Sequence, residues 1–241
     1  MPNRRITWLS PDDPPTSFPP VELALDEPDG LLAAGGDLSA ARLLDAYPRG
    51  IFPWYDSGQP ILWWSPDPRC ILYPEGFRLS RRMQRECRRS ALMLTVNRSF
   101  AAVMAACAAP RKPLQGTWIT SDMLSAYSEL HELGWAHSFE LWRDGRLVGG
   151  VYGLAIGQVF FGESMFHRES NASKLALFAL CSVLRTRGFA MLDCQTVSRH
   201  LLTLGAVTVP RRDFVAALAR LCTPAVAFGS WPREPLKLRE L

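Results

Sequence analysis

An Asp-Gly pair at residues 144 and 145 separates two runs of alternating apolar and polar residues, 137–143 and 146–157. Asp-Gly tolerates the positive φ angles of a two-residue hairpin turn, so the pair predicts two antiparallel strands. The following residues predict, in order, a strand at 157–166, a helix at 171–188 and a strand at 189–195. Two strands joined by a helix pair in parallel through a right-handed crossover. The chain therefore has to build a mixed sheet.

Two regions of different composition divide the chain. Residues 1–67 are rich in proline, glycine and aromatic side chains, and their one helical segment, 37–50, has Asp37 or Ser39 as its N-cap. From residue 68 the pattern becomes regular, with a strand at 91–100 and helices at 100–109 and 121–134. The predicted fold class is α+β, with a small irregular N-terminal domain, residues 1–67, and a mixed-sheet domain, residues 68–241.

The segment 49–69 places five aromatic side chains and four prolines in one short window. Proline fixes φ and lacks an amide donor, which argues against both a long helix and a central strand here. We therefore expect irregular chain of defined shape. Its rings suit either a packed plug between domains or a platform for binding.

The composition excludes several classes of protein. With 48% hydrophobic and 21% charged side chains in 241 residues, the chain is long enough and apolar enough for a packed core. It has no apolar run of the length that crosses a bilayer, so we expect a cytoplasmic protein without a membrane partner. The six cysteines form no CxxC pair, and we expect neither a metal nor a cofactor.

A stripe of arginines follows Phe77. Its members are Arg78, Arg81, Arg82, Arg85, Arg88 and Arg89. This spacing forms one stripe along a helix for which Ser80 is the predicted N-cap, with Arg78 just before the first turn. A solvated surface helix is the alternative, but such faces mix both signs, whereas Glu86 is the only acid here. The stripe is therefore predicted to contact phosphates of a nucleic acid.

Three polar residues lie on neighbouring strands of the predicted sheet. Asp193 and Gln195 alternate onto the same face of the strand 189–195, and Glu163 lies on the strand 157–166. An unpaired buried carboxylate is costly, so Asp193 requires either a partner or a function. We expect a negatively charged pocket, with Asp193 facing it free of a permanent arginine partner. A purely structural role for both acids is the alternative.

The order of elements resembles the acyltransferase fold of the N-acetyltransferase superfamily, whose substrates bind where two central strands part. Members of that superfamily that use coenzyme A hold its pyrophosphate with a glycine-rich loop at a helix N-terminus. The corresponding segment here, 166–174, contains no glycine. A coenzyme A substrate is therefore disfavoured.

Nine ordered blocks between about residue 18 and 215 resemble the leucyl/phenylalanyl-tRNA-protein transferase family. In chain order they are GLLAAGGDLSAARLLDAYPRGIFPWY, ILWWSPDPRCIL, GTWIT, AYSELHELGWAHSFE, LVGGVYG, GESMF, NASK, LDCQ and HLLTLGAVTVPRRDF. Two positions depart from the family pattern: His167 where serine is common, and Ser198 where asparagine is frequent.

The resemblance implies transfer of leucine or phenylalanine, or methionine, from aminoacyl-tRNA to an N-terminal lysine or arginine, which marks the acceptor for degradation. For this reaction the chemistry of the residues suggests Asp193 and Gln195 as the catalytic pair, and Glu163 with Asp193 as the acidic pocket for the acceptor. The resemblance and the aromatic segment add further substrate-binding residues, namely Tyr47, Trp54, Trp118, Tyr127, Val151, Phe160 and Leu177. The acceptor stem of the tRNA is expected to contact the arginine stripe, namely Arg81, Arg82, Arg85, Arg88 and Arg89.

The expected division of labour follows from the chemistry of an activated ester. The Gln195 oxygen would accept a hydrogen bond from the attacking amine, and Asp193 would orient the Gln195 amide. Val151, Phe160 and Leu177 would form the slot for the donor side chain. The rings of Tyr47 and Trp54 would stack on the terminal adenine.

Two other functions are compatible with the residues, a small-molecule N-acetyltransferase and a non-enzymatic RNA-binding module. The second would use the arginines and aromatic rings and leave Glu163 and Asp193 dispensable. Nothing in the sequence demands more than a monomer.

Overall fold

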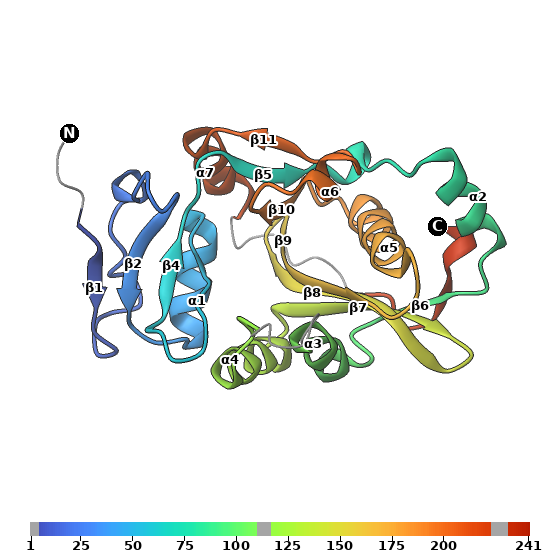
Figure 1. Ribbon diagram of the computed structural model, residues 1–241, viewed down its shortest axis with the longest axis horizontal. Helices are drawn as coiled ribbons and strands as arrows, with labels where there is room; N and C mark the ends of the chain where they lie inside the picture. Colours follow the sequence, from blue (N-terminus) through green and yellow to red (C-terminus); the bar gives the residue numbers. More distant parts are fainter. Residues whose placement is uncertain (1–4, 110–116, 223–230) are drawn as a thin grey trace.

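The computed structural model describes residues 5–109, 117–222 and 231–241. Two sheets organise these residues, a four-stranded sheet near the N-terminus and an eight-stranded sheet formed from residue 69 onward. Figure 1 shows the small sheet at one end of the molecule and the large sheet curving through the rest. The predicted α+β class with a mixed sheet is confirmed.

The small sheet corrects the expectation of an irregular N-terminal domain. Its strand order is β1-β2-β4-β3, with β1 at Thr7–Leu9, β2 at Leu31–Gly35, β4 at Leu62–Trp64 and β3 at Phe52–Pro53. The strand β4 is therefore a central strand, contrary to the prediction for 49–69. Proline leaves it intact because Pro53 lies on the edge strand β3.

The large sheet has the order β11-β5-β10-β9-β8-β7-β6-β12. Its strands are β5 (Arg69–Leu72), β6 (Met93–Val96), β7 (Ala136–Arg143), β8 (Arg146–Ile156), β9 (Val159–His167), β10 (Met191–Gln195), β11 (Val207–Val209) and β12 (Leu236–Lys237). Within it β9 and β10 pair in parallel, as predicted. The hairpin between β7 and β8 is confirmed, with positive φ at both Asp144 and Gly145.

Helices cover both faces of the large sheet. The helices of the described residues are α1 (Ala40–Ala46), α2 (Arg81–Arg89), α3 (Phe100–Ala108), α4 (Ser121–Glu132), α5 (Ala172–Thr186), α6 (Arg199–Leu202) and α7 (Arg211–Leu221). Within the described ranges, short 3-10 segments lie at Val21–Leu23, Tyr47–Arg49, Pro74–Gly76 and Leu238–Glu240. In Figure 1, α5 lies on one side of the large sheet and α3 and α4 lie on the other.

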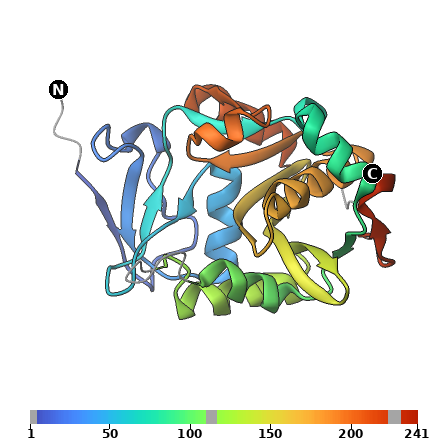
Figure 2. The ribbon, with the colours of Figure 1, turned by 45° about the vertical axis from the view of Figure 1, so that its right-hand side comes forward.

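The core joins the two sheets. One cluster of buried side chains contains Trp63 from the small sheet, Phe161 from the large sheet and Tyr47, which follows α1. Figure 2 shows α1 between the two sheets, and α1 packs against α4. A second cluster lies beneath α5. The sheets change between Trp64 and Arg69, but the shared core means that a domain boundary at residue 67 stays a prediction.

Within the described ranges, no helix combines the length and the apolar character needed to cross a membrane.

Candidate active site

The strands β9 and β10 part at one point, and the polar residues lie just beyond it. Their parallel pairing ends where Asp193 faces Phe161. On the other side of β9, the pairing with β8 shifts so that Gly162 and Ser164 both have partners and Glu163 lies between them as an extra residue. Glu163 stays on the same side as Phe161, as strict alternation predicts, since Tyr47 packs against the Phe161 ring and donates a hydrogen bond to Glu163.

Three neutral donors hold the Glu163 carboxylate. Its Oε1 accepts hydrogen bonds from the Tyr47 hydroxyl at 2.7 Å and the Gln195 carboxamide nitrogen at 2.8 Å. Its Oε2 accepts from the Tyr127 hydroxyl at 3.1 Å, and the two tyrosine hydroxyls also contact each other. Four chain segments, β9, β10, α4 and the turn after α1, therefore meet at this carboxylate.

Burial determines the acidity of this group. Removal from water raises the pKa of Glu163 to about 7, although the hydrogen bonds from Tyr47 and Tyr127 oppose the shift. The negative charge of Asp193 adds to the increase in pKa. Glu163 therefore changes its charge near neutral pH. Burial and the nearby Glu163 raise the pKa of Tyr47 well above its usual value, so this hydroxyl stays protonated and donates.

Gln195 has an unusual backbone. Its φ of +62° lies in the left-handed region, which costs a residue with a side chain roughly 1–3 kcal/mol. The conformation is held by a 2.9 Å hydrogen bond from the Gln195 amide to Oδ1 of Asp193, at an irregularity in the β5–β10 pairing. A strained residue at a polar site is typical of a functional position.

Asp193 does not match the expectation of a free carboxylate. It is fully buried, and both oxygens bind the guanidinium group of Arg69, Oδ1 at 2.9 Å and Oδ2 at 2.7 Å. The Gln195 carboxamide that Asp193 was expected to orient binds Glu163 instead. The physical reason is that an arginine on the adjacent β5 compensates the cost of burying the charge. Asp193 thus contacts the backbone of Gln195 and leaves Glu163 as the carboxylate without a cation.

A small apolar pocket adjoins the two carboxylates. Its volume is about 110 Å³, and its apolar lining consists of Val151, Met165, Leu177, Leu180, Leu192 and Leu201. Glu163, Asp193 and Cys194 also line it. The structure thus brings together the predicted Val151 and Leu177. Phe160 is fully buried in the same cluster, where it packs edge-on against Phe139.

The predicted aromatic residues divide into two groups. Tyr47 and Tyr127 are fully buried, so they offer hydroxyl groups to Glu163 rather than faces to a base. The expectation that Tyr47 stacks on the terminal adenine is therefore wrong. Trp118 is partly buried against the first core cluster.

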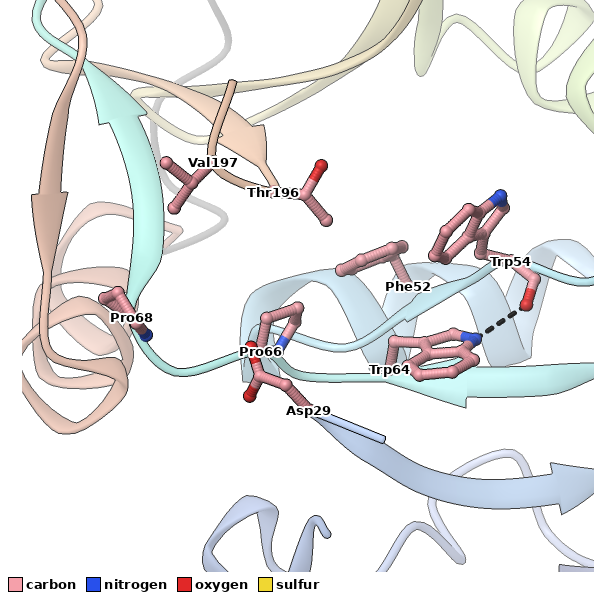
Figure 3. Close-up of a pocket in the computed structure, with 8 residues that line it drawn as sticks. All are labelled: Asp29, Phe52, Trp54, Trp64, Pro66, Pro68, Thr196 and Val197. Carbon is pink, nitrogen blue, oxygen red and sulfur yellow. Dashed lines mark hydrogen bonds between the residues drawn. The ribbon is translucent and has the colours of Figure 1, made fainter. Parts of the chain in front are cut away.

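Trp54, in contrast, is 45% exposed and lines a separate pocket of about 150 Å³ (Figure 3). Phe52 and Trp64 line the same pocket, and Thr196 and Val197, which directly follow Gln195, form its far side. The Trp64 indole donates a 2.6 Å hydrogen bond to the Trp54 carbonyl oxygen, and the centroids of the two rings lie 5.6 Å apart. This exposed aromatic surface lies next to the end of β10.

A family model described as leucyl/phenylalanyl-tRNA protein transferase matches residues 71–219, and the model of that family's N-terminal domain matches residues 36–67. The chain belongs to the leucyl/phenylalanyl-tRNA-protein transferase family. A curated relative of that name from Methylococcus capsulatus is 51% identical over 95% of this chain and 98% of its own length. Another, from Aromatoleum aromaticum, is 54% identical over 95% of each chain. Among solved structures, one of FemX covers 71% of this chain and 66% of its own, with a TM-score of 0.44 and 11% identity.

Membership of the leucyl/phenylalanyl-tRNA-protein transferase family confirms that the chain is a transferase enzyme. The two positions at which the sequence is expected to depart from the family pattern line the same pocket. His167 and Ser198 line a third pocket, of about 920 Å³, at the start of α5. Arg168, Lys174 and His200 also line it. The departures therefore lie in one cleft, which adjoins the apolar pocket at Met165.

The arginine stripe of this transferase forms the predicted helix. Ser80 caps α2, and its Oγ accepts a hydrogen bond from the Met83 amide. Met83 and Cys87 are buried on one side of α2. The arginines at 81, 82, 85, 88 and 89 are exposed on the other side. Glu86 accepts a 3.1 Å hydrogen bond from Asn171 at the start of α5, and α2 lies at the end of the molecule opposite the small sheet (Figure 1).

Sequence reasoning missed Arg69 in this leucyl/phenylalanyl-tRNA-protein transferase. It occurs in the quoted block ILWWSPDPRCIL, but β5 was not predicted, so nothing placed Arg69 beside Asp193. The available signal was the need for a cation near a carboxylate in an apolar strand. Among the described residues, no group of histidine, cysteine and acidic side chains is arranged to hold a metal ion.

Proposed function

We propose that this transferase moves leucine or phenylalanine from aminoacyl-tRNA to the α-amino group of an N-terminal lysine or arginine. The observation that carries the proposal is the hydrogen bond between Gln195 and Glu163 beside an apolar pocket, at the point where β9 and β10 part. A polar pair next to an apolar slot suits the union of an apolar donor with a basic acceptor.

The donor side chain enters the apolar pocket lined by Val151 and Leu177. At about 110 Å³ it is somewhat smaller than the roughly 150 Å³ cavity that admits benzene in a model protein. One leucine or phenylalanine side chain is therefore the size of guest that suits it, with modest adjustment for the aromatic ring. Phe160 supports the wall of the slot from the core.

The acceptor amine attacks the ester carbonyl carbon, so a C–N bond forms while the bond from carbon to the ribose oxygen breaks. The proton lost by nitrogen ends on the departing ribose oxygen. An α-amino group has a pKa of about 7.7–8.0, so a fraction of it is a neutral nucleophile near neutral pH. The reaction therefore depends more on alignment than on a strong base, and alignment is worth roughly 7–11 kcal/mol.

Gln195 provides the contact to the attacking amine. The Gln195 carboxamide nitrogen donates to Glu163, so the carboxamide oxygen of Gln195 is the atom that accepts a hydrogen bond from the amine. Asp193 acts one step away, as a positioning residue that holds the Gln195 backbone. Glu163 has two roles: it orients the Gln195 carboxamide, and its negative charge attracts the cationic N-terminal residue of the acceptor.

The tRNA is held at two places. The exposed ring of Trp54 stacks on the terminal adenine, and Trp118 supports the same region. Arg81, Arg82, Arg85, Arg88 and Arg89 contact the phosphates of the acceptor stem without reading its sequence. The modified acceptors are marked for degradation, and the enzyme acts as a cytoplasmic monomer.

The test is transfer of labelled leucine from charged tRNA to a peptide that begins with arginine, with a peptide that begins with glycine as the control. We expect transfer to the first peptide and background counts for the second. A reaction with labelled acetyl-coenzyme A is the second control, and acetylation in place of aminoacyl transfer would refute the proposal.

A further inference from the structure

Arg69 is buried as completely as any side chain of the core, although it carries a charge. Its Nε and Nη2 atoms donate two parallel hydrogen bonds to Asp193, at 2.9 and 2.7 Å. A planar guanidinium group fits a carboxylate in this way, whereas a lysine ammonium group offers no matching fork. The two bonds therefore fix both the position and the orientation of the Asp193 carboxylate.

Two aromatic rings confine the same guanidinium group. The rings of Phe52 and Phe214 each have their centroid 4.7 Å from Cζ of Arg69. One ring belongs to the small sheet and the other to α7, so groups from three separate segments hold the cation. The arginine cannot shift without moving both rings.

The third arm of Arg69 binds the turn that follows α1. Its Nη1 donates a 3.1 Å hydrogen bond to the carbonyl oxygen of Gly50. Gly50 ends the 3-10 turn that begins at Tyr47, and its φ of +79° favours glycine. Since the Tyr47 hydroxyl binds Glu163, Arg69 is linked by short chains of contacts to both Gln195 and Glu163.

Stability alone does not explain such a residue. Replacing a buried ion pair by well-packed apolar residues is often neutral or stabilising. Arg42, the other fully buried arginine of the described chain, provides a comparison. It binds Asp37 and the carbonyl oxygen of Asp13 within the small N-terminal region and contacts none of the site residues. Of these two arginines, only Arg69 connects to the polar groups where β9 and β10 part.

We propose that Arg69 is a positioning residue for the transfer reaction. Through Asp193 it keeps Gln195 in its left-handed conformation, and through Gly50 it keeps the Tyr47 hydroxyl against Glu163. The inference rests on the proposed function, because it assigns Gln195 the contact to the attacking amine.

The first experiment compares Arg69→Lys with Arg42→Lys, which also retains a buried positive charge. For Arg69→Lys we expect kcat for leucine transfer to fall on the order of 100-fold, the loss that a misplacement of about 1 Å can cause. The KM for leucyl-tRNA should stay within about a factor of two of wild type, because the donor sites are intact. Arg42→Lys should lower the melting temperature but leave kcat unchanged.

A double-mutant cycle shows whether Arg69 acts through Asp193. If it does, Arg69→Lys should lower kcat much less in an Asp193→Asn background than in the wild type. Equal factors in both backgrounds would overturn the proposed route. So would a folded Arg69→Lys variant with wild-type kcat.

A variant that leaves the ion pair in place covers the case in which Arg69→Lys does not fold. Phe214→Leu removes one of the two rings, and Leu218→Ala makes a cavity one turn further along α7 as its control. We expect only Phe214→Leu to reduce kcat, by roughly tenfold for a partial loss of alignment. Equal kcat for the two variants would overturn the inference. Absence of transfer by the wild-type chain would instead refute the proposed function.

Discussion

The two carboxylates of the site, on adjacent strands, have opposite surroundings. Asp193 is fully buried against the guanidinium group of Arg69 and makes no hydrogen bond to a side chain that lines the apolar pocket. Glu163 is partly exposed and is held only by neutral donors, two tyrosine hydroxyls and one carboxamide. One charge is neutralised in place, and the other titrates near pH 7.

This difference assigns separate tasks to two residues that look alike in the sequence. A carboxylate held by two parallel hydrogen bonds from arginine has a fixed position, which suits the alignment of neighbouring backbone. A carboxylate among neutral donors keeps a charge that a cationic substrate can meet. Glu140 is fully buried like Asp193, but it accepts hydrogen bonds from Thr95 and Ser138 outside the site, so burial by itself does not define the function.

Removing the fixed charge should give the largest effect. Asp193→Ala leaves Arg69 buried without its partner, so we expect the free energy of unfolding to fall by about 3–5 kcal/mol. Urea denaturation measures it. Asp37→Ala is the control and should cost less, because the Asp37 side chain is 31% exposed and Arg42 keeps its backbone acceptors. Equal losses of unfolding free energy in the two variants would refute the difference between the two ion pairs. An Asp193→Ala variant with full turnover would remove Asp193 from the mechanism.

Neutralising the other carboxylate should affect catalysis more than stability. For Glu163→Gln we expect kcat/KM with an arginine-terminated peptide to fall about 100-fold, typical of the loss of one positioned polar group. The matched control is Glu140→Gln, which removes a buried charge away from the site and should keep its activity. Steady-state transfer assays compare the variants. If both lost activity equally, the special place of Glu163 would be refuted.

The acidity of Glu163 predicts a pH dependence with a definite sign. The folded-state pKa of about 7 exceeds the usual 4.5, so the native state binds more protons than the unfolded state between these values. Its contribution to stability is therefore complete below pH 4.5 and is lost as the pH rises to about 7, at no more than about 1.4 kcal/mol per pH unit. The difference in unfolding free energy between wild type and Glu163→Gln, measured at pH 5 and pH 8, should shift in that direction. A constant difference would contradict the assignment.

Trp54→Ala tests whether binding of the tRNA end is separate from both carboxylates. We expect a loss of about 1–3 kcal/mol in the use of aminoacyl-tRNA, the range for one stacked base, with a smaller change in unfolding free energy. The pH profile of transfer should keep the wild-type form. Comparable losses in KM and in stability would favour a packing plug at this position.

The arginine stripe should give the smallest effect at physiological salt, because exposed charges are screened there. Neutralising Arg82 and Arg85 together should reduce the slope of log affinity for tRNA against log salt by about 2. Arg146 and Arg212, exposed arginines on the β7–β8 hairpin and on α7, form the control pair. Filter binding between low and high salt measures both slopes, and identical slopes would exclude the stripe from tRNA binding.

Local patterns predicted the elements that depend on local chemistry. The Asp144-Gly145 turn, the cap at Ser80 and the crossover from β9 to β10 all agree with the structure. The missed strands are short and have no alternation to reveal them, for example β4 between β2 and β3 and β5 beside β10. Their pairing is decided by partners distant in sequence, which propensity does not register.

The sequence by itself determined the mixed sheet, the arginine helix and the placing of Glu163, Asp193 and Gln195 on neighbouring strands, because alternation and turn chemistry are local, and the resemblance to acyltransferases located the opening between those strands. Only the tertiary structure decided which of the two carboxylates has no cationic partner. Arg69 lies 124 positions before Asp193 and meets it through antiparallel pairing of β5 with β10. Charge neutralisation over that separation depends on packing, and packing left Glu163 as the carboxylate that can change its charge near neutral pH.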